Sequence, residues 1–244
     1  MRVRISAQSL HKAGSAPEEN DDAFAFTTTA GGARLAVADG ATESAFSGEW
    51  ATALVQAWTE SDYRRIEPSL LEQSLGQWRS TIPEAGALPW YGQAKLAQGS
   101  HATLACVRLL RRRSGWRWTA DVVGDSEVLV FASRHRLRCR RRFPFDKSAS
   151  FGYHPQLVTT DPRSWAGLSV ERFTGTASAP FELWVASDAL AQSLLAADEH
   201  GRPNWDAWAD AVEDGSAFGA QVVAMRTSGA MRNDDVTLVR VKAW

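Results

Sequence analysis

The chain has 244 residues, with 27 Lys and Arg against 28 Asp and Glu, which gives a formal net charge of −1. This balance argues against a generally basic nucleic-acid-binding protein, and an apolar content of 44% excludes disorder as a description of the whole chain. No apolar run reaches the ~18 residues of a membrane span, and the N-terminus lacks the apolar stretch of a secretory signal. Cys106 and Cys139 are too few for a disulfide framework and lack metal-type spacing, so we expect free thiols and a cytoplasmic location.

Three strands are predicted before residue 40. Polar and apolar residues alternate over 2–6, as in a half-buried strand. Apolar runs follow at 23–26 and 34–38, and a Gly-containing turn separates them. The second run stops at Asp39, so the chain changes direction there.

Two helices are predicted next, because apolar residues recur at helical spacing over 50–58 and 70–78. Ser69-x-x-Glu72 near the start of the second resembles a capping box. Gly and Pro punctuate residues 83–99, which we expect to be irregular.

The second half is expected to contain mostly strands, then helices, then one last strand. Residues 143–180 show no strong periodicity and are expected to form a flap or a long excursion. Strands are predicted at 101–110, 116–123, 127–133, 134–140, 181–186 and 236–241, and helices at 205–213 and 217–226.

This order of elements predicts an α+β fold with antiparallel sheets. No internal repeat or interdomain linker is visible, so residues 1–244 are interpreted as a single domain. The 11 tryptophans fall mostly at expected core positions and are interpreted as packing residues.

Aspartates stand where several predicted strands begin or end: Asp22, Asp39, Asp125, Asp188 and Asp234. Carboxylate oxygens are the ligands that Mg²⁺ and Mn²⁺ prefer. If these strand ends converge, the repulsion between the carboxylates requires a cation. Taken singly, each aspartate is more often a turn or capping residue than a ligand.

In order and in strand context, these motifs resemble those of the metal-dependent serine/threonine protein phosphatases of type 2C. The similarity runs from about residue 2 to residue 242, and it implies a four-layer α-β-β-α sandwich of two antiparallel β-sheets flanked by helix pairs, with a metal site in a cleft at one end. The motifs are Asn20-Asp21-Asp22-Ala23, Ala38-Asp39-Gly40, Gly99-Ser100…Thr103, Val123-Gly124-Asp125-Ser126, Ala186-Ser187-Asp188 and Asp234-Asp235-Val236-Thr237.

The resemblance also implies a role for each position. Two Mn²⁺ or Mg²⁺ ions would activate a water that attacks the phosphorus of phosphoserine or phosphothreonine, without a Cys, Ser or His nucleophile. The implied partners are a phosphorylated protein substrate and a counterpart serine/threonine kinase. The implied ligands are Asp39 as the bridge between the metals, the Gly40 carbonyl, Asp22, Asp188 and Asp234, with Asp125 at a third, weaker site.

One departure from the family pattern concerns the grip on the substrate phosphate. The family usually carries an Arg where this chain has Pro17. Lys12 is the residue that we expect to supply the positive charge, with His11 and Arg4 as alternatives, although Lys lacks the bidentate Arg fork. The departure motivates a second hypothesis, a pseudophosphatase or phosphoprotein-binding regulator that keeps the fold with little turnover.

Arginines are concentrated between residues 108 and 142, where eleven arginines stand against three acidic residues. In the simplest interpretation, the arginines form the solvated face of a strand and discourage pairing of its edge with another strand. The alternative is docking of an acidic or phosphorylated partner, while nucleic acid is disfavoured because no aromatic residues are interleaved. A strand would place Arg134, Arg136, Arg138 and Arg140 on one face and His135, Leu137 and Cys139 on the other.

Overall fold

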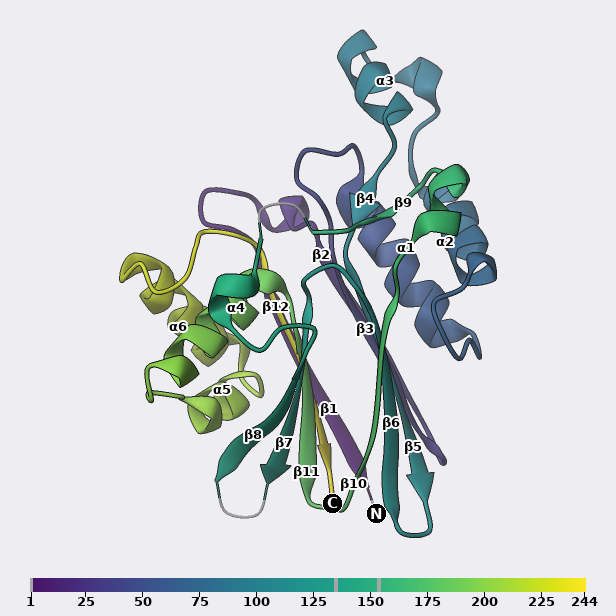
Figure 1. Cartoon of the computed structure of the whole chain (residues 1–244). Helices are drawn as coiled ribbons and strands as arrows, with labels where there is room; N and C mark the ends of the chain where they lie inside the picture. Colours follow the sequence, from purple (N-terminus) through teal and green to yellow (C-terminus); the bar gives the residue numbers. More distant parts are fainter. Residues whose placement is uncertain (1, 134–135, 153–154) are drawn as a thin grey trace.

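The computed structural model describes residues 2–133, 136–152 and 155–244. Two five-stranded antiparallel sheets pack face to face, and helices cover the outer face of each sheet (Figure 1). The predicted α+β sandwich is therefore confirmed. Within the described residues, no helix is both long and apolar enough to cross a membrane.

The first sheet has the strand order β1-β12-β11-β7-β8 and packs against three helices, where a pair was expected. Both chain ends lie in this sheet, because β1 and β12 pair along their whole length. Its strands are β1 (Val3–Leu10), β12 (Val236–Ala243), β11 (Phe181–Ala186), β7 (Glu127–Ser133) and β8 (Leu137–Phe143), and its helices are α4 (Asp188–Glu199), α5 (Trp205–Ala211) and α6 (Gly215–Thr227).

The second sheet has the order β10-β6-β5-β3-β2 and packs against the helix pair α1 and α2. Its strands are β10 (Glu171–Ala177), β6 (Gly115–Val123), β5 (Leu104–Arg112), β3 (Gly32–Asp39) and β2 (Asp22–Thr29), and its helices are α1 (Ser47–Glu60) and α2 (Pro68–Thr81).

Strand β3 shows how the layers are built. Side chains alternate between the two faces of a strand, so Leu35 and Val37 pack between the sheets while Ala36 and Ala38 contact the α1 side. The small alanines let α1 approach, and the buried Trp50 fills the space between helix and sheet. A continuous apolar strand buried on both faces stops abruptly at Asp39, which fixes where that carboxylate emerges.

Two helices were missed by the sequence analysis. The segment 83–99 was expected to be irregular but contains α3 (Trp90–Ala97), which has no buried residue and therefore no apolar stripe to reveal it. Helix α4 was missed for the opposite reason. It buries residues on several sides, including Ala189, Leu190 and Leu195, so its apolar residues show no single face.

Three local expectations were wrong. The predicted strand 101–110 is split at Thr103 into β4 (His101–Ala102) and β5, and β4 pairs with β9 (Val158–Thr159). The segment 143–180 contains the edge strand β10, whose mostly exposed residues give a weak pattern. Helix α2 has no side-chain cap, because it begins at Pro68 and the Ser69 hydroxyl donates to Glu67 instead.

The arginine stripe is broken by a β-bulge. The register of β8 against β7 shifts between Val130 and Phe131, so Arg140 is an extra residue without a partner. As a result Arg142 faces α4, where it pairs with Asp198. Arg134 of the predicted arginine face and His135 of the opposite face lie outside the described residues.

Candidate metal centre

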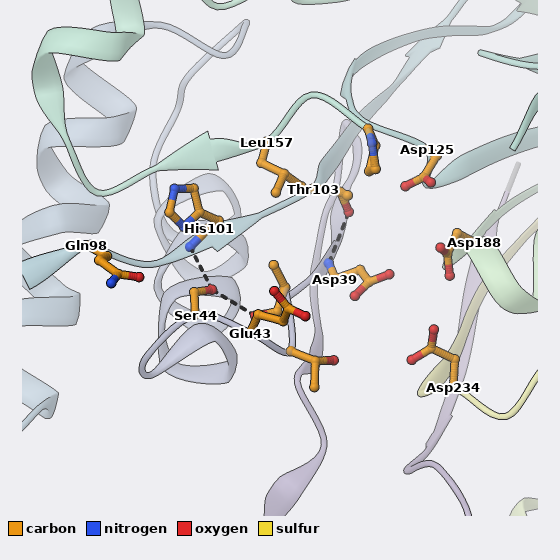
Figure 2. Close-up of a pocket in the computed structure, with 15 residues that line it drawn as sticks. Asp39, Glu43, Ser44, Gln98, His101, Thr103, Asp125, Leu157, Asp188 and Asp234 are labelled. Carbon is orange, nitrogen blue, oxygen red and sulfur yellow. Dashed lines mark hydrogen bonds between the residues drawn. The ribbon is translucent and has the colours of Figure 1, made fainter. Parts of the chain in front are cut away.

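The predicted carboxylates meet at one end of the sandwich. Asp39 is the last residue of β3 and lies opposite Asp22, the first residue of β2. Asp125 lies in the β6–β7 turn, Asp188 begins α4 directly after β11, and Asp234 precedes β12. In Figure 2 the side chains of Asp39, Asp125, Asp188 and Asp234 point toward a common space. These four residues line an open cleft of about 600 Å³ that extends past Glu43 and His101.

Several of these carboxylates are buried without hydrogen-bond donors. Both side-chain oxygens of Asp22 and of Asp125, and Oδ1 of Asp188, are buried and unpartnered. Asp22 is 8% exposed and Asp125 only 1%. Buried polar groups are almost always satisfied, and a buried charge requires a counter-charge. The oxygen-only donor set and its missing partners therefore fit one or more hard divalent cations.

The pKa values of these carboxyl groups are raised, as expected where buried negative charges lie close together. Burial, followed by repulsion from Asp22, Asp234 and Asp125, raises the pKa of Asp39 well above its usual range. Burial also raises the pKa of Asp22 to about 7; the nearby hydroxyls of Thr237 and Ser187 offset part of this shift, and repulsion from Asp235 and Asp234 adds to it.

Burial likewise raises the pKa of Asp125, in the β6–β7 turn, to about 6, and repulsion from Asp234 raises this pKa by a smaller amount. Without a cation, the cluster resists full ionisation.

Arg232 supplies a positive charge inside this cluster. Its guanidinium forms an ion pair with Asp188, and its Nε lies 3.2 Å from Oδ2 of Asp234. Among the described residues, no group of three His, Cys, Asp or Glu side chains is arranged closely enough to hold a metal ion. No pattern in the sequence predicts this role of Arg232. The only available signal was its place two residues before Asp234.

Gly40 is required by a close backbone approach. Its N–H donates to the carbonyl oxygen of Asp21 at 3.1 Å. A Cβ at position 40 would lie 2.8 Å from that same oxygen and 2.8 Å from the backbone of Ser47. Only glycine lets the loop after β3 pass between the first motif and α1, which keeps the Gly40 carbonyl beside Asp39 at the cleft.

Thr103 holds two motifs together. Its Oγ1 accepts the N–H of Asp39 at 3.2 Å, and its own N–H donates to the Asp39 carbonyl at 2.8 Å. The same hydroxyl lies 2.9 Å from Oγ of Ser126, next to Asp125. The Gly-Ser…Thr motif of the sequence thus fixes the backbone of Asp39 relative to the β6–β7 turn.

Asp235 shapes the loop of the first motif. It accepts the backbone N–H of Lys12 at 2.7 Å and that of Asp21 at 2.8 Å. Asn20 accepts the N–H of Asp22 at 3.0 Å, which orients that residue into β2. The loop before β2 is therefore tied to the start of β12.

The predicted phosphate grip is only partly assembled. Lys12 lies near enough to Asp21 to lower the pKa of that carboxyl, which burial raises overall, but neither Lys12 nor His11 lines the cleft. Arg4 pairs with Glu213 and lies opposite Lys242 in the sheet, at the far end of β1 from Leu10. It therefore points to the opposite end of the sandwich and supplies no charge to the cleft.

Comparison with known proteins agrees with this geometry. A family model described as protein phosphatase 2C matches residues 11–225. No curated protein sequence gives a significant match. Solved structures with low sequence identity share the fold over almost their whole length.

Three of these structures illustrate the likeness. The catalytic domain of the serine threonine protein phosphatase PstP, in complex with two manganese ions, has a TM-score of 0.55 at 18% identity, covering 98% of this chain and 97% of that one. The S. agalactiae serine/threonine phosphatase has a TM-score of 0.58 at 15% identity, with 100% of each chain covered. RsbX in complex with magnesium has a TM-score of 0.53 at 15% identity, covering 98% and 94%. Together with the family match, the fold and the cleft show that the chain belongs to the protein phosphatase 2C family of protein serine/threonine phosphatases.

Proposed function

We propose that this chain hydrolyses phosphoserine and phosphothreonine in proteins with the help of two divalent cations, Mn²⁺ or Mg²⁺. The observation that carries the proposal is the set of buried carboxylate oxygens of Asp22, Asp125 and Asp188 without hydrogen-bond partners, of which Asp125 and Asp188 line the cleft. When bound, such ions lower the pKa of water and stabilise the negative charge that develops on the phosphoryl oxygens. A cytoplasmic phosphoprotein and a counterpart serine/threonine kinase are the proposed partners.

In this proposal each residue has a defined task. Asp39 and the Gly40 carbonyl would hold the two ions, and Asp125 would contribute to a third, weaker site. Thr103 holds the Asp39 backbone in place. The remaining proposed ligands are Asp22 and Asp188, which begin β2 and α4, and Asp234, which lies two residues before β12.

The substrate is held by residues of the same chain. The cleft is open enough to admit a phosphorylated side chain, and it continues past Ser44 and His101 toward α3. Lys12 remains the proposed phosphate-binding side chain. Once Arg232 leaves Asp188, its guanidinium is a second cation at the edge of the same cluster.

Two observations favour the alternative, a regulator that binds a phosphoprotein with little turnover. Arg232 already forms ion pairs with two of the proposed metal ligands, and Pro17 stands where an arginine is usual in the family. The two functions differ in whether the cations displace the guanidinium.

Hydrolysis of a phosphothreonine peptide tests the proposal. We expect phosphate release by the wild type with Mn²⁺, none with EDTA, and at least a hundredfold loss in Asp39→Asn, because removing a charge from the centre weakens both proposed metal positions. Asp161→Asn is the matched control, since this carboxylate pairs with Arg163 away from the cleft. Equal rates with Mn²⁺ and EDTA would refute the proposed mechanism.

A further inference from the structure

Eight exposed arginines gather at the end of the sandwich that faces away from the cleft. They come from the β5–β6 hairpin and from the start and middle of β8. Figure 1 shows the β5–β6 turn and the start of β8 at the end of the molecule away from β4 and α3, as two groups with β7, β11 and β10 between them. We call this surface the arginine end. Its members are Arg111, Arg112, Arg113, Arg117, Arg136, Arg138, Arg140 and Arg141.

Within the described residues, none of these eight arginines forms an ion pair, although the Asp206 carboxylate accepts the N–H of Leu137 at the start of β8. In the part of the chain that the structure describes, other arginines form ion pairs, such as Arg142 with Asp198 and Arg240 with Glu182, but none of the eight lies within 4.0 Å of a carboxylate. The net charge of the chain is −1, so the eight arginines carry +8 while all other residues sum to −9. Surfaces that serve only solubility mix both signs. Here a cluster of carboxylates lies at the cleft, while arginines without ion pairs are concentrated toward the other end.

Protection of a sheet edge explains only part of this surface. Strand β8 is an edge strand, and its arginines and its bulge do discourage pairing with another chain. Arg117 lies on β6, which is paired on both sides by β10 and β5. Arg112 and Arg113 lie at the β5–β6 turn, where there is no free edge to protect. A second role is needed for these residues.

A groove of about 260 Å³ opens within the arginine end. Its apolar floor includes Trp118, Val130 and Phe181, and Arg140 and Arg141 stand at its rim. Trp118 and Phe181 are 1% and 3% exposed, so their rings form a floor and do not project into solvent. The groove thus presents a small apolar recess bordered by positive charge.

We propose that the arginine end docks an acidic segment of a partner protein, with one apolar side chain of that segment in the groove and its carboxylates on the surrounding arginines. The guanidinium fork binds carboxylates in a bidentate manner, and an uncompensated positive surface accelerates encounter with an acidic partner. The proposal does not depend on catalysis.

The shape of the surface selects a protein over the two other anionic partners. A lipid headgroup surface is flat and leaves a recessed groove unfilled. Single-stranded nucleic acid stacks its bases on exposed aromatic rings, whereas the rings of Trp118 and Phe181 are buried. A peptide can alternate carboxylates with one apolar side chain, which matches an apolar recess that Arg140 and Arg141 help to line.

The position of the arginine end has a consequence for the cleft. The two sites lie at opposite ends of the sandwich, so a docked partner leaves the cleft accessible (Figure 1). The partner therefore recruits the chain to a location or to a complex, and it does not block the cleft.

Fluorescence anisotropy tests the proposal with a defined probe, a fluorescein-labelled peptide of eight glutamates around one central tryptophan. We expect binding that weakens as salt rises, and about a tenfold loss of affinity in Arg140→Ala/Arg141→Ala, because two charged contacts and the groove rim are removed. The matched control is Arg79→Ala/Arg202→Ala, which removes the same charge from exposed arginines elsewhere. Hydrolysis of a small aryl phosphate and circular dichroism should be unchanged in both variants.

Each contrary outcome is distinguishable. An equal loss in the control variant would mean that only net charge matters, and it would overturn the docking site. Equal affinity for a peptide of nine glutamates would overturn the role of the groove. Tighter binding of a single-stranded DNA oligomer, or of vesicles containing phosphatidylserine, with the same dependence on Arg140 and Arg141 would overturn the choice of a protein partner. Because binding is the readout, an inactive enzyme would not affect these conclusions.

Discussion

Arg232 and Asp234 form an ion pair inside the cluster of carboxylates that we propose as metal ligands, with Arg232 Nε 3.2 Å from Asp234 Oδ2. The same guanidinium also contacts Asp188. It therefore places positive charge on two of the oxygens that a cation would use. Arg232 and a bound ion compete for these carboxylates, and this competition makes the arginine a direct probe of the centre.

Replacing Arg232 should strengthen cation binding. We expect Arg232→Gln to bind Mn²⁺ about five- to tenfold more tightly in calorimetry, because the ion no longer displaces an ion pair that, at 36% exposure of the arginine side chain, contributes about 1 kcal/mol. In EDTA the variant should unfold at a lower temperature, since two carboxylates lose their counter-charge.

Arg172→Gln is the matched control for this variant. Arg172 is 37% exposed and its Nε lies 3.1 Å from Asp121 Oδ1, outside the cleft. It should leave Mn²⁺ affinity unchanged. An unchanged affinity in Arg232→Gln as well would show that the guanidinium and the ion occupy separate places.

The metal-free protein should lose stability as pH rises. The folded-state pKa of Asp22 is about 7 and that of Asp125 about 6, both raised mainly by burial, whereas an unfolded Asp titrates near pH ~4. Between these values the folded state binds more protons than the unfolded state, so the free energy of unfolding falls with increasing pH and levels off above the folded pKa values.

Thermal unfolding in EDTA at about pH 5.5, inside that window, and at about pH 8, above it, measures this effect. We expect a higher midpoint at the lower pH and a smaller difference in Asp22→Asn, in which the amide does not ionise. Saturating Mn²⁺ should remove most of the pH dependence, because a cation stabilises the ionised carboxylates. A midpoint that rises with pH in EDTA would contradict the assignment.

The hydroxyl of Thr103 is expected to matter more than its volume. Thr103→Val keeps the shape but removes the acceptor for the Asp39 N–H and the contact with Ser126. We expect a loss of about 1–2 kcal/mol in the free energy of unfolding, measured in urea, and weaker Mn²⁺ binding. Thr103→Ser should restore both properties, and no recovery in the serine variant would show that the methyl group is the important part.

Substitution of Gly40 tests whether the loop after β3 needs glycine to pass the backbone of Asp21 and Ser47. Gly40→Ala places a Cβ 2.8 Å from backbone atoms of Asp21 and Ser47, so we expect a loss of about 1–3 kcal/mol and displacement of the loop after β3. Gly76→Ala is the matched control, because its Cβ meets no atom within 4 Å and helix α2 gains from alanine. Equal stability of the two variants would refute the packing argument.

The sequence predicts the layers and the carboxylates for the same physical reason. Strands buried on one or both faces leave strong apolar patterns, and a polar residue such as Asp39 marks where such a strand must end. The elements without buried surface leave little pattern, as in α3 and β10. The break at Thr103 was hidden because β4 and β5 are adjacent and both extended.

Arg232 shows what could not be predicted. Its contact with Asp188 joins residues 44 positions apart, and only the meeting of the β11 and β12 ends brings them together. The position of Arg4 could not be predicted either, because the end of the sandwich at which Arg4 lies depends on how β1 pairs with β12. Long-range relationships of this kind depend on topology, and the local sequence carries no record of them.

The central claim is that the carboxylates at the cleft form a two-cation centre that supports hydrolysis. The most direct measurement is stepwise addition of Mn²⁺ to metal-free protein, with calorimetry and phosphate release from a phosphothreonine peptide followed in parallel. The proposed centre predicts that two ions bind per chain, that hydrolysis appears as the second ion binds, and that Asp39→Asn loses both. Two bound ions without phosphate release would contradict the proposed enzyme and support the regulator, and no binding at all would contradict the metal centre itself.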